Sequence, residues 1–216
     1  GDEAFCNCSA LASITIPESV TSIGYDAFLN TPWYNNKPDG VMYIGKLLYK
    51  FKGNMPANTS INIEEGTISI CDKAFYDCTS LTSIIIPNSV TSIGSNAFHG
   101  CTSLKELELP NNIIVIGKSA FGGCDSLTSV TIPYSLKSLG GAAFSYCESL
   151  DTVIWDATDC VVNLDNMIEP FAFSSVTSFI FNDSVEHIPA RLLCSETSLT
   201  SITIPVNVHT IGESAF

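Results

Sequence analysis

The sequence predicts a solenoid of short parallel strands, one per coil, and three observations lead to that prediction. Similar segments recur every 23 residues, most clearly LTSIIIPNSVTSIGSNAFHGC, LKELELPNNIIVIGKSAFGGC and LTSVTIPYSLKSLGGAAFSYC at 81–101, 104–124 and 127–147. Each copy contains a short run that alternates apolar and polar residues, which is typical of a strand with one buried face. The remaining apolar residues are spaced three to four apart, which indicates turns and short helical pieces.

The alternating motif predicts eight strands. Five copies end in proline, which closes a strand because it cannot donate the next ladder hydrogen bond; they lie at 14–17, 84–87, 107–110, 130–133 and 202–205. Three degenerate copies lie at 61–64, 153–156 and 179–182. We expect these strands to form one extended concave sheet.

The period of 23 residues falls within the range of about 20–29 that is typical of leucine-rich repeats. We therefore expect turns with short helical or 3₁₀ pieces on the convex side. A glycine column accompanies the repeat, at Gly24, Gly94, Gly117, Gly140 and Gly212. Because Cys71 and Pro189 occupy the same column, and proline fixes φ at about −65°, we expect this column to reflect lack of room rather than a left-handed backbone.

Two places depart from the period within a chain predicted to be a single solenoid segment over 1–216. An irregular repeat covers about 29–57, where two β-rich runs on either side of Gly45-Lys46 predict a hairpin in place of one standard coil. Three extra residues fall within about 156–170. Insertions in solenoids go to loops and often mark the binding face.

Composition and charge limit the possible partners. Hydrophobic residues make up 45% of the chain and charged residues 14%, which is far from a disordered composition. The net charge of −13 argues against nucleic acid and anionic membranes, which need basic patches. No apolar run approaches the roughly 18 residues of a membrane helix. Residues 1–5 and 212–216 share one phase of the repeat without a polar capping coil, so both ends are expected to be cut within a repeat.

Nine cysteines raise the possibility of disulfides or a metal site. Stacked coils would set the cysteines of one repeat position about 5 Å apart in a line, which permits disulfides but is not a tetrahedral metal site. We expect an inert buried ladder there, with Cys160 and Cys194 as the more reactive thiols. The ladder comprises Cys8, Cys78, Cys101, Cys124 and Cys147.

Nothing in the sequence predicts catalysis, a metal or a cofactor. His99, His187 and His209 lie at three different repeat phases, without the nucleophile and acid that a triad needs. No phosphate loop, H-E-x-x-H or dinucleotide motif is present. Ice binding through threonine ladders would need an unbroken array, and acidic residues interrupt this one.

The pattern L-x-x-I-x-I-P-x-x-V-x-x-I-G-x-x-A-F-x-x-C, quoted above in three copies, resembles the BspA-like leucine-rich repeats of bacterial surface proteins. The segment 31–53 also resembles the irregular unit that such proteins often carry. The resemblance implies an extracellular or surface-exposed protein of a host-associated microbe that acts in adhesion, with a host extracellular protein or glycan as partner. It carries no catalytic residues.

The outward positions of the strands form the candidate binding surface. Small hydroxyl residues dominate these positions, and the departures from them are informative: Ile85, Ile154 and Ile180 are apolar, whereas Glu106 and Glu108 form an acidic pair. We expect a protein or glycan contact around Ile85, Glu106, Glu108 and Ile154. Drift on a tolerant surface is the alternative.

A second candidate is the aromatic cluster of Trp33, Tyr34, Tyr43 and Tyr49. Exposed aromatic rings stack on sugars and anchor protein interfaces; alternatively, these rings pack the hairpin onto the solenoid.

The sequence therefore predicts a non-catalytic ligand-binding or adhesion module that uses its concave sheet. The alternative is a structural spacer, with binding elsewhere in the full-length protein.

Overall fold

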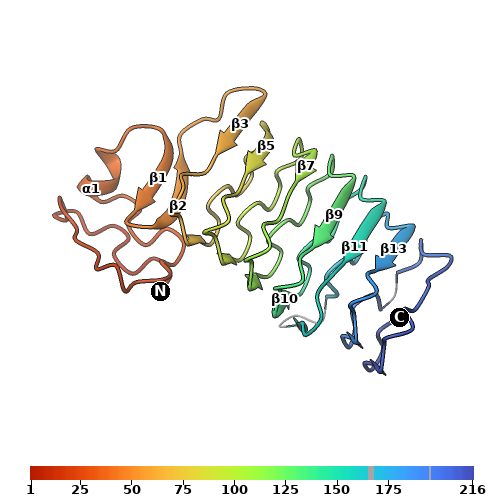
Figure 1. Ribbon diagram of the computed structural model, residues 1–216. Helices are drawn as coiled ribbons and strands as arrows, with labels where there is room; N and C mark the ends of the chain where they lie inside the picture. Colours follow the sequence, from red (N-terminus) through yellow and green to blue (C-terminus); the bar gives the residue numbers. More distant parts are fainter. Residues whose placement is uncertain (165–167, 195) are drawn as a thin grey trace.

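The computed structural model describes residues 1–164, 168–194 and 196–216 and confirms the solenoid, with the two termini at opposite ends (Figure 1). Its elements in chain order are α1 (Pro32–Asn35), β1 (Gly40–Ile44), β2 (Leu47–Lys52), β3 (Thr59–Asn62), β4 (Ser69–Ile70), β5 (Leu81–Ile85), β6 (Ser92–Ile93), β7 (Glu106–Leu107), β8 (Val115–Ile116), β9 (Ser129–Ile132), β10 (Ser138–Gly140), β11 (Thr152–Trp155), β12 (Val161–Asn163), β13 (Ser178–Phe181), β14 (His187–Ile188) and β15 (Thr210–Ile211).

Six of the eight predicted strands lie side by side along one face, as β3, β5, β7, β9, β11 and β13 (Figure 1). We call the outward side of these strands the strand face. They form two parallel three-stranded sheets, β3-β5-β7 and β9-β11-β13, instead of one continuous sheet. The ladder stops between β7 and β9, where β7 is only two residues long and contains a glutamate, a residue that suits strands poorly.

The first and last predicted strands are weaker than expected. Residues 14–17 lie outside every strand. The chain that follows this coil forms α1 instead of a strand, and a main-chain hydrogen bond from Trp33 to Leu11 (2.9 Å) joins the two. At the other end, the strand predicted at 202–205 is reduced to one bridge between Ile180 and Thr203.

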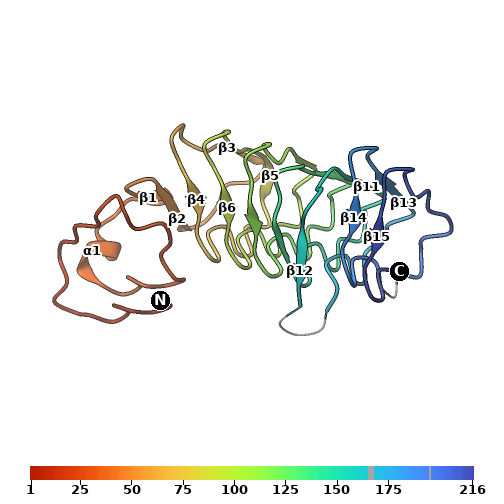
Figure 2. The same cartoon turned by 60° about the horizontal axis from the view of Figure 1, so that its bottom comes forward.

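A seven-stranded sheet, which we call the second sheet, covers another side of the solenoid (Figure 2). Its strand order is β1-β2-β4-β6-β8-β10-β12, and β14 and β15 form a separate parallel pair. The prediction of short helical or 3₁₀ pieces on the return path is therefore wrong, because the described residues there form short strands and turns. The apolar spacing of three to four residues arises from chain that turns repeatedly while each coil hydrogen-bonds to the next.

The predicted hairpin is confirmed. β1 and β2 pair antiparallel around Gly45, and β2 then pairs parallel with β4, so the hairpin joins the second sheet. Ahead of it, α1 begins at Pro32, and the hydroxyl of Thr31 accepts a hydrogen bond from the amide of Tyr34 (3.1 Å). A capping hydroxyl and a proline in the first turn are the usual start of a helix.

The third side of each coil consists of turns, which we call the turn side; in the clearest copy it spans 94–101. Coils hydrogen-bond to each other here as well, for example from the amide of Phe98 to the carbonyl of Ala120 (2.7 Å). Inside these turns the phenylalanine rings stack, with centroids 5.1 Å apart between Phe98 and Phe121. The core is thus a set of identical side chains layered along the solenoid axis.

Lack of room explains the glycine column, as predicted. None of these glycines has a positive φ. A Cβ at Gly94, Gly117 or Gly140 would lie 2.4–2.6 Å from the main-chain nitrogen of the preceding coil. The two exceptions, Cys71 and Pro189, follow the hairpin coil and the coil with the insertion, where the layer beneath is irregular.

The insertion predicted within about 156–170 includes residues 165–167, which lie outside the described residues. The described part of that coil begins regularly. β12 pairs with β10 so that Val161 stands opposite Ser138, one repeat of 23 residues earlier. The change of spacing therefore comes after β12.

Candidate functional site

The strand face presents three isoleucines outward, as expected from the alternation of strand side chains. On β5, Ile84 is buried while Ile85 is 62% exposed. On β11 and β13, Ile154 and Ile180 stand directly opposite each other and are 36% and 48% exposed. The structure thus places one isolated apolar side chain on β5 and an adjacent apolar pair on β11 and β13.

The acidic pair lies between these two apolar positions along the chain and along the face. Glu106 stands opposite Ser83 of β5, and Leu107 between the two glutamates is buried. Glu106 and Glu108 are both exposed. The four predicted residues therefore share one side of the solenoid, with the carboxylates on the coil where the two three-stranded sheets separate.

Hydroxyl groups form the background of this face. The side chains of Ser60 and Ser83 are hydrogen-bonded to each other (2.6 Å), one repeat apart. Beyond β13, a recess of about 340 Å³ is lined by residues that include Ser178, Ile180, Ser201 and Thr203. Sequence reasoning missed this recess, although its signal was present: the outward positions of the last two coils differ in side-chain size, as Ile180 faces Thr203.

The second predicted cluster divides in the structure. Tyr34 and Tyr49 are buried, and Trp33 is partly buried with its ring centroid 5.2 Å from that of Phe28. The hydroxyl of Tyr49 accepts a hydrogen bond from the amide of Phe28 (3.1 Å), and burial raises the pKa of Tyr49 to about 12. These contacts favour the packing alternative, and a binding role for Trp33 and Tyr34 stays a prediction.

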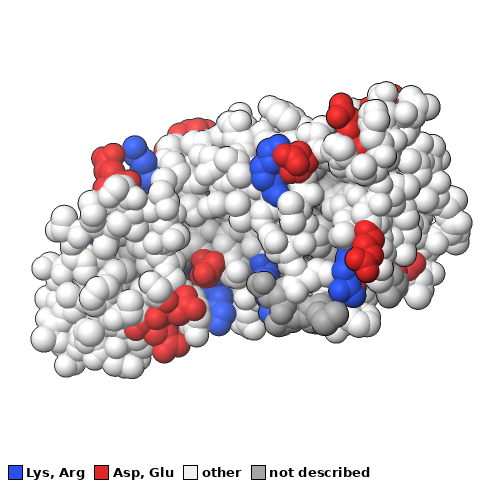
Figure 3. Space-filling model, turned by 90° about the horizontal axis from the view of Figure 1, so that it is seen from below, with Lys and Arg blue, Asp and Glu red and all other residues white. Residues whose placement is uncertain are grey.

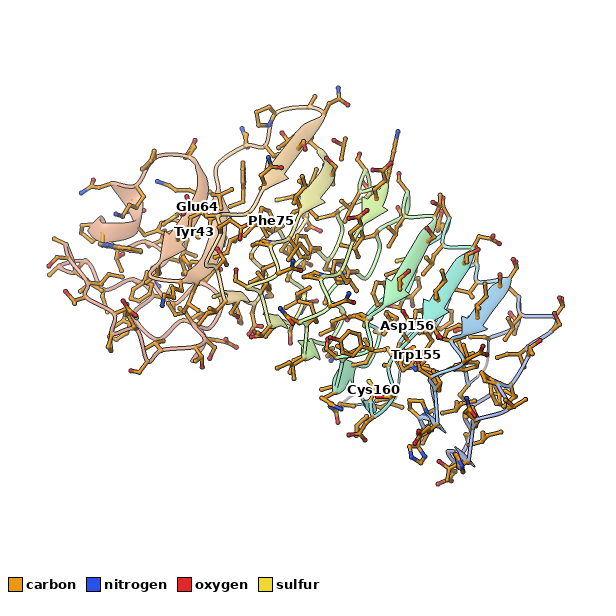
Figure 4. The ribbon with its side chains drawn as sticks, viewed as in Figure 1. Tyr43, Glu64, Phe75, Trp155, Asp156 and Cys160 are labelled. Atoms are coloured by element: carbon orange, nitrogen blue, oxygen red, sulfur yellow. The ribbon has the colours of Figure 1, made fainter. Side chains whose placement is uncertain are left out.

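Tyr43 lies apart from those rings. Its hydroxyl accepts a hydrogen bond from the amide of Glu64 (3.0 Å). Figure 4 shows Tyr43 and Glu64 next to each other, with Phe75 beside them. It packs against the main core rather than the smaller core around Phe28. The structure therefore brings three of the four predicted aromatic residues together and separates the fourth.

The cysteine ladder is buried only in its regular part. Cys101, Cys124 and Cys147 are fully buried, and the thiol of each donates to a phenylalanine carbonyl at 3.2–3.4 Å. Cys78, which borders a recess beside the hairpin coil, is half-buried, and Cys8 is exposed. Burial raises the pKa of Cys147 to about 12, so the inner thiols are poor nucleophiles at neutral pH.

The surroundings of Cys160 disfavour its expected place among the more reactive thiols, which stays a prediction. Desolvation raises its pKa to about 12, and its Sγ lies 3.7 Å from the carbonyl oxygen of Val161. Figure 4 shows it close to Trp155, whose indole N–H donates to the carbonyl of Ala157 (2.9 Å). The side chain of Cys160 is only partly exposed, because it packs against the main core.

Charged side chains are sparse, and on the side seen in Figure 3 most basic groups lie beside acidic ones. The exposed pairs Lys46–Glu18 and Lys137–Asp159 are both 3.3 Å long; pairs of this kind contribute about 0–1 kcal/mol. Within the described ranges, no group of three or more His, Cys, Asp or Glu side chains is placed to hold a metal ion. No helix of the described chain is long and apolar enough to cross a bilayer.

The family model of the BspA type leucine rich repeat region matches the chain in 6 copies over residues 1–50, 44–165 and 165–216. No curated protein is similar enough in sequence to be recognised as a relative.

Solved leucine-rich repeat proteins share the fold. A protein from Eubacterium ventriosum has a TM-score of 0.70 at 22% identity, with 94% of this chain and 57% of that one covered. The leucine rich repeat protein of T. pallidum has a TM-score of 0.51 at 26% identity, over 77% and 73% of the two chains.

A leucine rich cell surface protein from Faecalibacterium prausnitzii is 27% identical with a TM-score of 0.49, and this chain spans 43% of that protein while 95% of this chain is covered. The repeat match extends over almost every described coil, and the stacked layers of phenylalanine, glycine and cysteine are its physical basis. The chain belongs to the BspA type leucine rich repeat family.

Proposed function

We propose that this chain is a non-catalytic ligand-binding or adhesion module, exposed at a cell surface or secreted, whose strand face contacts a host extracellular protein or glycan. The observation that supports the proposal is the adjacent pair Ile154 and Ile180, exposed on neighbouring strands of a face that is otherwise rich in hydroxyl groups. Solenoids commonly bind partners through such extended surfaces.

The arrangement of the face has the features of an interface. Apolar side chains that a partner can bury dominate the binding energy of interfaces, and charged groups around them set orientation and association rate. Here Ile154 and Ile180 form the apolar centre. Glu106 on β7 and Glu108 directly after it carry the negative charge. Ile85 extends the apolar surface on the other side of the acidic coil.

A binding screen against extracellular-matrix proteins and glycans, repeated over a salt series, tests this proposal. The matched variants are Ile154→Thr and Ile180→Thr, because threonine occupies the same outward column at Thr131 and Thr203 and suits a strand. We expect binding to be lost while the unfolding free energy changes by about 0.5 kcal/mol or less. Val161→Thr on β12, exposed on the second sheet, is the control that should retain binding.

Reversal of Glu106 and Glu108 to Lys tests the charge contribution. A basic partner should associate more slowly with the reversed variant, and salt should weaken its binding to the wild type. If the folded segment binds nothing in the screen, the strand face is not an adhesion surface and the spacer function replaces it. The hydrogen-bonded pair of hydroxyl groups at Ser60 and Ser83, which carries no charge, is the observation that favours a spacer.

A further inference from the structure

The turn side contains a repeat column with a left-handed backbone, two residues after the phenylalanine position. Residues that tolerate this conformation occupy most of the column: Asn7, Asn30, Asp77, Gly100 and Gly123 all have φ between 55° and 72°. The next two coils place Tyr146 and Phe173 there instead, at φ of 58° and 60°. Other side chains adopt the same conformation elsewhere on the turn side, for example Lys73 and Arg191 at φ of 54° and 56°, so the backbone is a feature of the repeat and the departure lies in the two aromatic side chains.

Neither aromatic ring contributes to the core. Tyr146 is 55% exposed and Phe173 is 67% exposed. The two rings stack on each other with centroids 4.9 Å apart and planes 17° apart. This spacing equals the separation of neighbouring coils, so the rings are stacked along the solenoid axis. The outer face of Tyr146 therefore looks toward Gly123, which has no side chain to cover it.

The neighbouring column departs from the repeat at the same place. In the regular coils this column holds a buried cysteine whose thiol donates to a phenylalanine carbonyl, as Cys124 does to Phe98 (3.4 Å). The last two coils have Ser174 and Glu196 at that position. Ser174 Oγ and Glu196 Oε1 are both buried without a hydrogen-bond partner. Both oxygen atoms can accept a hydrogen bond from a bound group.

These side chains surround one recess of about 330 Å³, lined by residues that include Glu169, Phe173, Ser174, Glu196 and Thr197. Two carboxylates lie here, and only one is compensated within the described residues. The Oε1 atom of Glu169 lies 3.7 Å from Nη2 of Arg191. No Lys or Arg in the described ranges forms an ion pair with Glu196, and burial, with a smaller contribution from Glu169, raises the pKa of Glu196 to about 7.

We propose that this recess on the turn side binds a basic side chain, Lys or Arg, of a partner polypeptide, held between the Phe173 ring and the Glu196 carboxylate. An exposed aromatic face attracts cations, and a carboxylate that lacks an opposite charge is stabilised by one. A guanidinium or ammonium group also supplies the hydrogen-bond donors that Glu196 Oε1 and Ser174 Oγ lack. The net charge of −13 favours the approach of basic partners.

The recess is separate from the strand face, because its residues belong to the turns that include Glu169 and Glu196 rather than to β11 or β13. The inference therefore does not depend on the proposed function. Ile154→Thr should leave binding at the recess unchanged, so failure of one proposal is distinguishable from failure of the other.

Titration of the whole chain with acetyl-Gly-Arg-Gly-amide, followed by amide chemical shifts, tests the proposal. A single basic side chain is small enough that we expect dissociation constants on the order of millimolar. The expected shifts lie at Phe173, Ser174 and Thr197, with similar results for the Lys peptide and none for the Gln peptide. Glu196→Gln and Phe173→Asn should each weaken binding by about tenfold.

The controls match each change. Glu65→Gln removes one exposed carboxylate elsewhere, and Tyr134→Asn removes an exposed aromatic ring from another turn; both should bind the peptide as the wild type does. Because asparagine is a residue of the same left-handed column, Phe173→Asn should keep or raise the melting temperature. If Phe173→Asn does not fold, Glu196→Gln carries the test.

Three results would overturn the proposal: no shifts at tens of millimolar peptide, undiminished binding by Glu196→Gln, or shifts at the recess with neutral sugars but not with basic peptides.

Discussion

The main-chain nitrogen of Ser95 lies so close to Gly117 of the next coil that a Cβ on Gly117 would be 2.6 Å from it. The obstacle is backbone rather than the end of a flexible side chain, so neither coil can yield without disturbing its ladder. Every regular coil repeats this contact. The glycine column is therefore a spacing requirement of the stack.

Gly117→Ala should destabilise the protein by about 2 kcal/mol or more, as overpacked cores do. The matched comparison is Cys71→Ala. Cys71 lies in the same column after the irregular hairpin coil and already has a Cβ, so this change should lower the unfolding free energy by about 1 kcal/mol or less. Denaturant unfolding followed by circular dichroism measures both. Equal losses would mean that the contact at Gly117 is not what determines the residue type.

Thiol alkylation should follow burial instead of repeat position. In the folded protein at pH 8 we expect Cys8 to react rapidly and Cys147 and Cys160 to resist, because burial raises the pKa of each of the latter two to about 12. Mass spectrometry of peptides after timed alkylation would show the order. All thiols should react at similar rates in denaturant, and rapid native labelling of Cys160 would contradict its burial.

Glu196 should make stability depend on pH. Its folded pKa is raised from 4.5 to about 7 by desolvation, so the folded state binds a proton more tightly than the unfolded state does. The associated stability is complete below about pH 4.5 and is lost as the pH rises through about 7. Glu196→Gln should therefore raise the melting temperature at pH 8 more than at pH 5. A difference that is the same at both pH values would show that the carboxyl is not buried.

Trp33→Ala distinguishes packing from binding at the hairpin coil. Trp33 contacts Phe28 and receives Lys37 over its ring at 5.2 Å, so its removal should destabilise the smaller core by about 3 kcal/mol. An early, separate unfolding step should appear in the variant, because solenoid coils depend mainly on their neighbours. An unchanged melting curve combined with lost ligand binding would instead make Trp33 a site residue.

The coil follows from the amino-acid sequence alone. Apolar residues that must be buried in every layer recur with the period, so the positions of Phe98, Cys124 and Ile132 follow from the pattern alone. The hairpin around Gly45 and the steric role of Gly94 were also predictable, because turn chemistry and a proline in the same column are visible in the sequence. The outward positions Ile85 and Ile154 were predictable from strand alternation.

The seven-stranded second sheet could be recognised only in the folded chain. The three-to-four spacing is shared by helical turns and by chain that bends between short strands, so the second sheet was not predictable from the period. The same holds for Cys160, whose burial depends on the coil that packs against it. The recess between Phe173 and Glu196 also needed the structure, because its parts lie in different repeat columns and meet only when two coils stack.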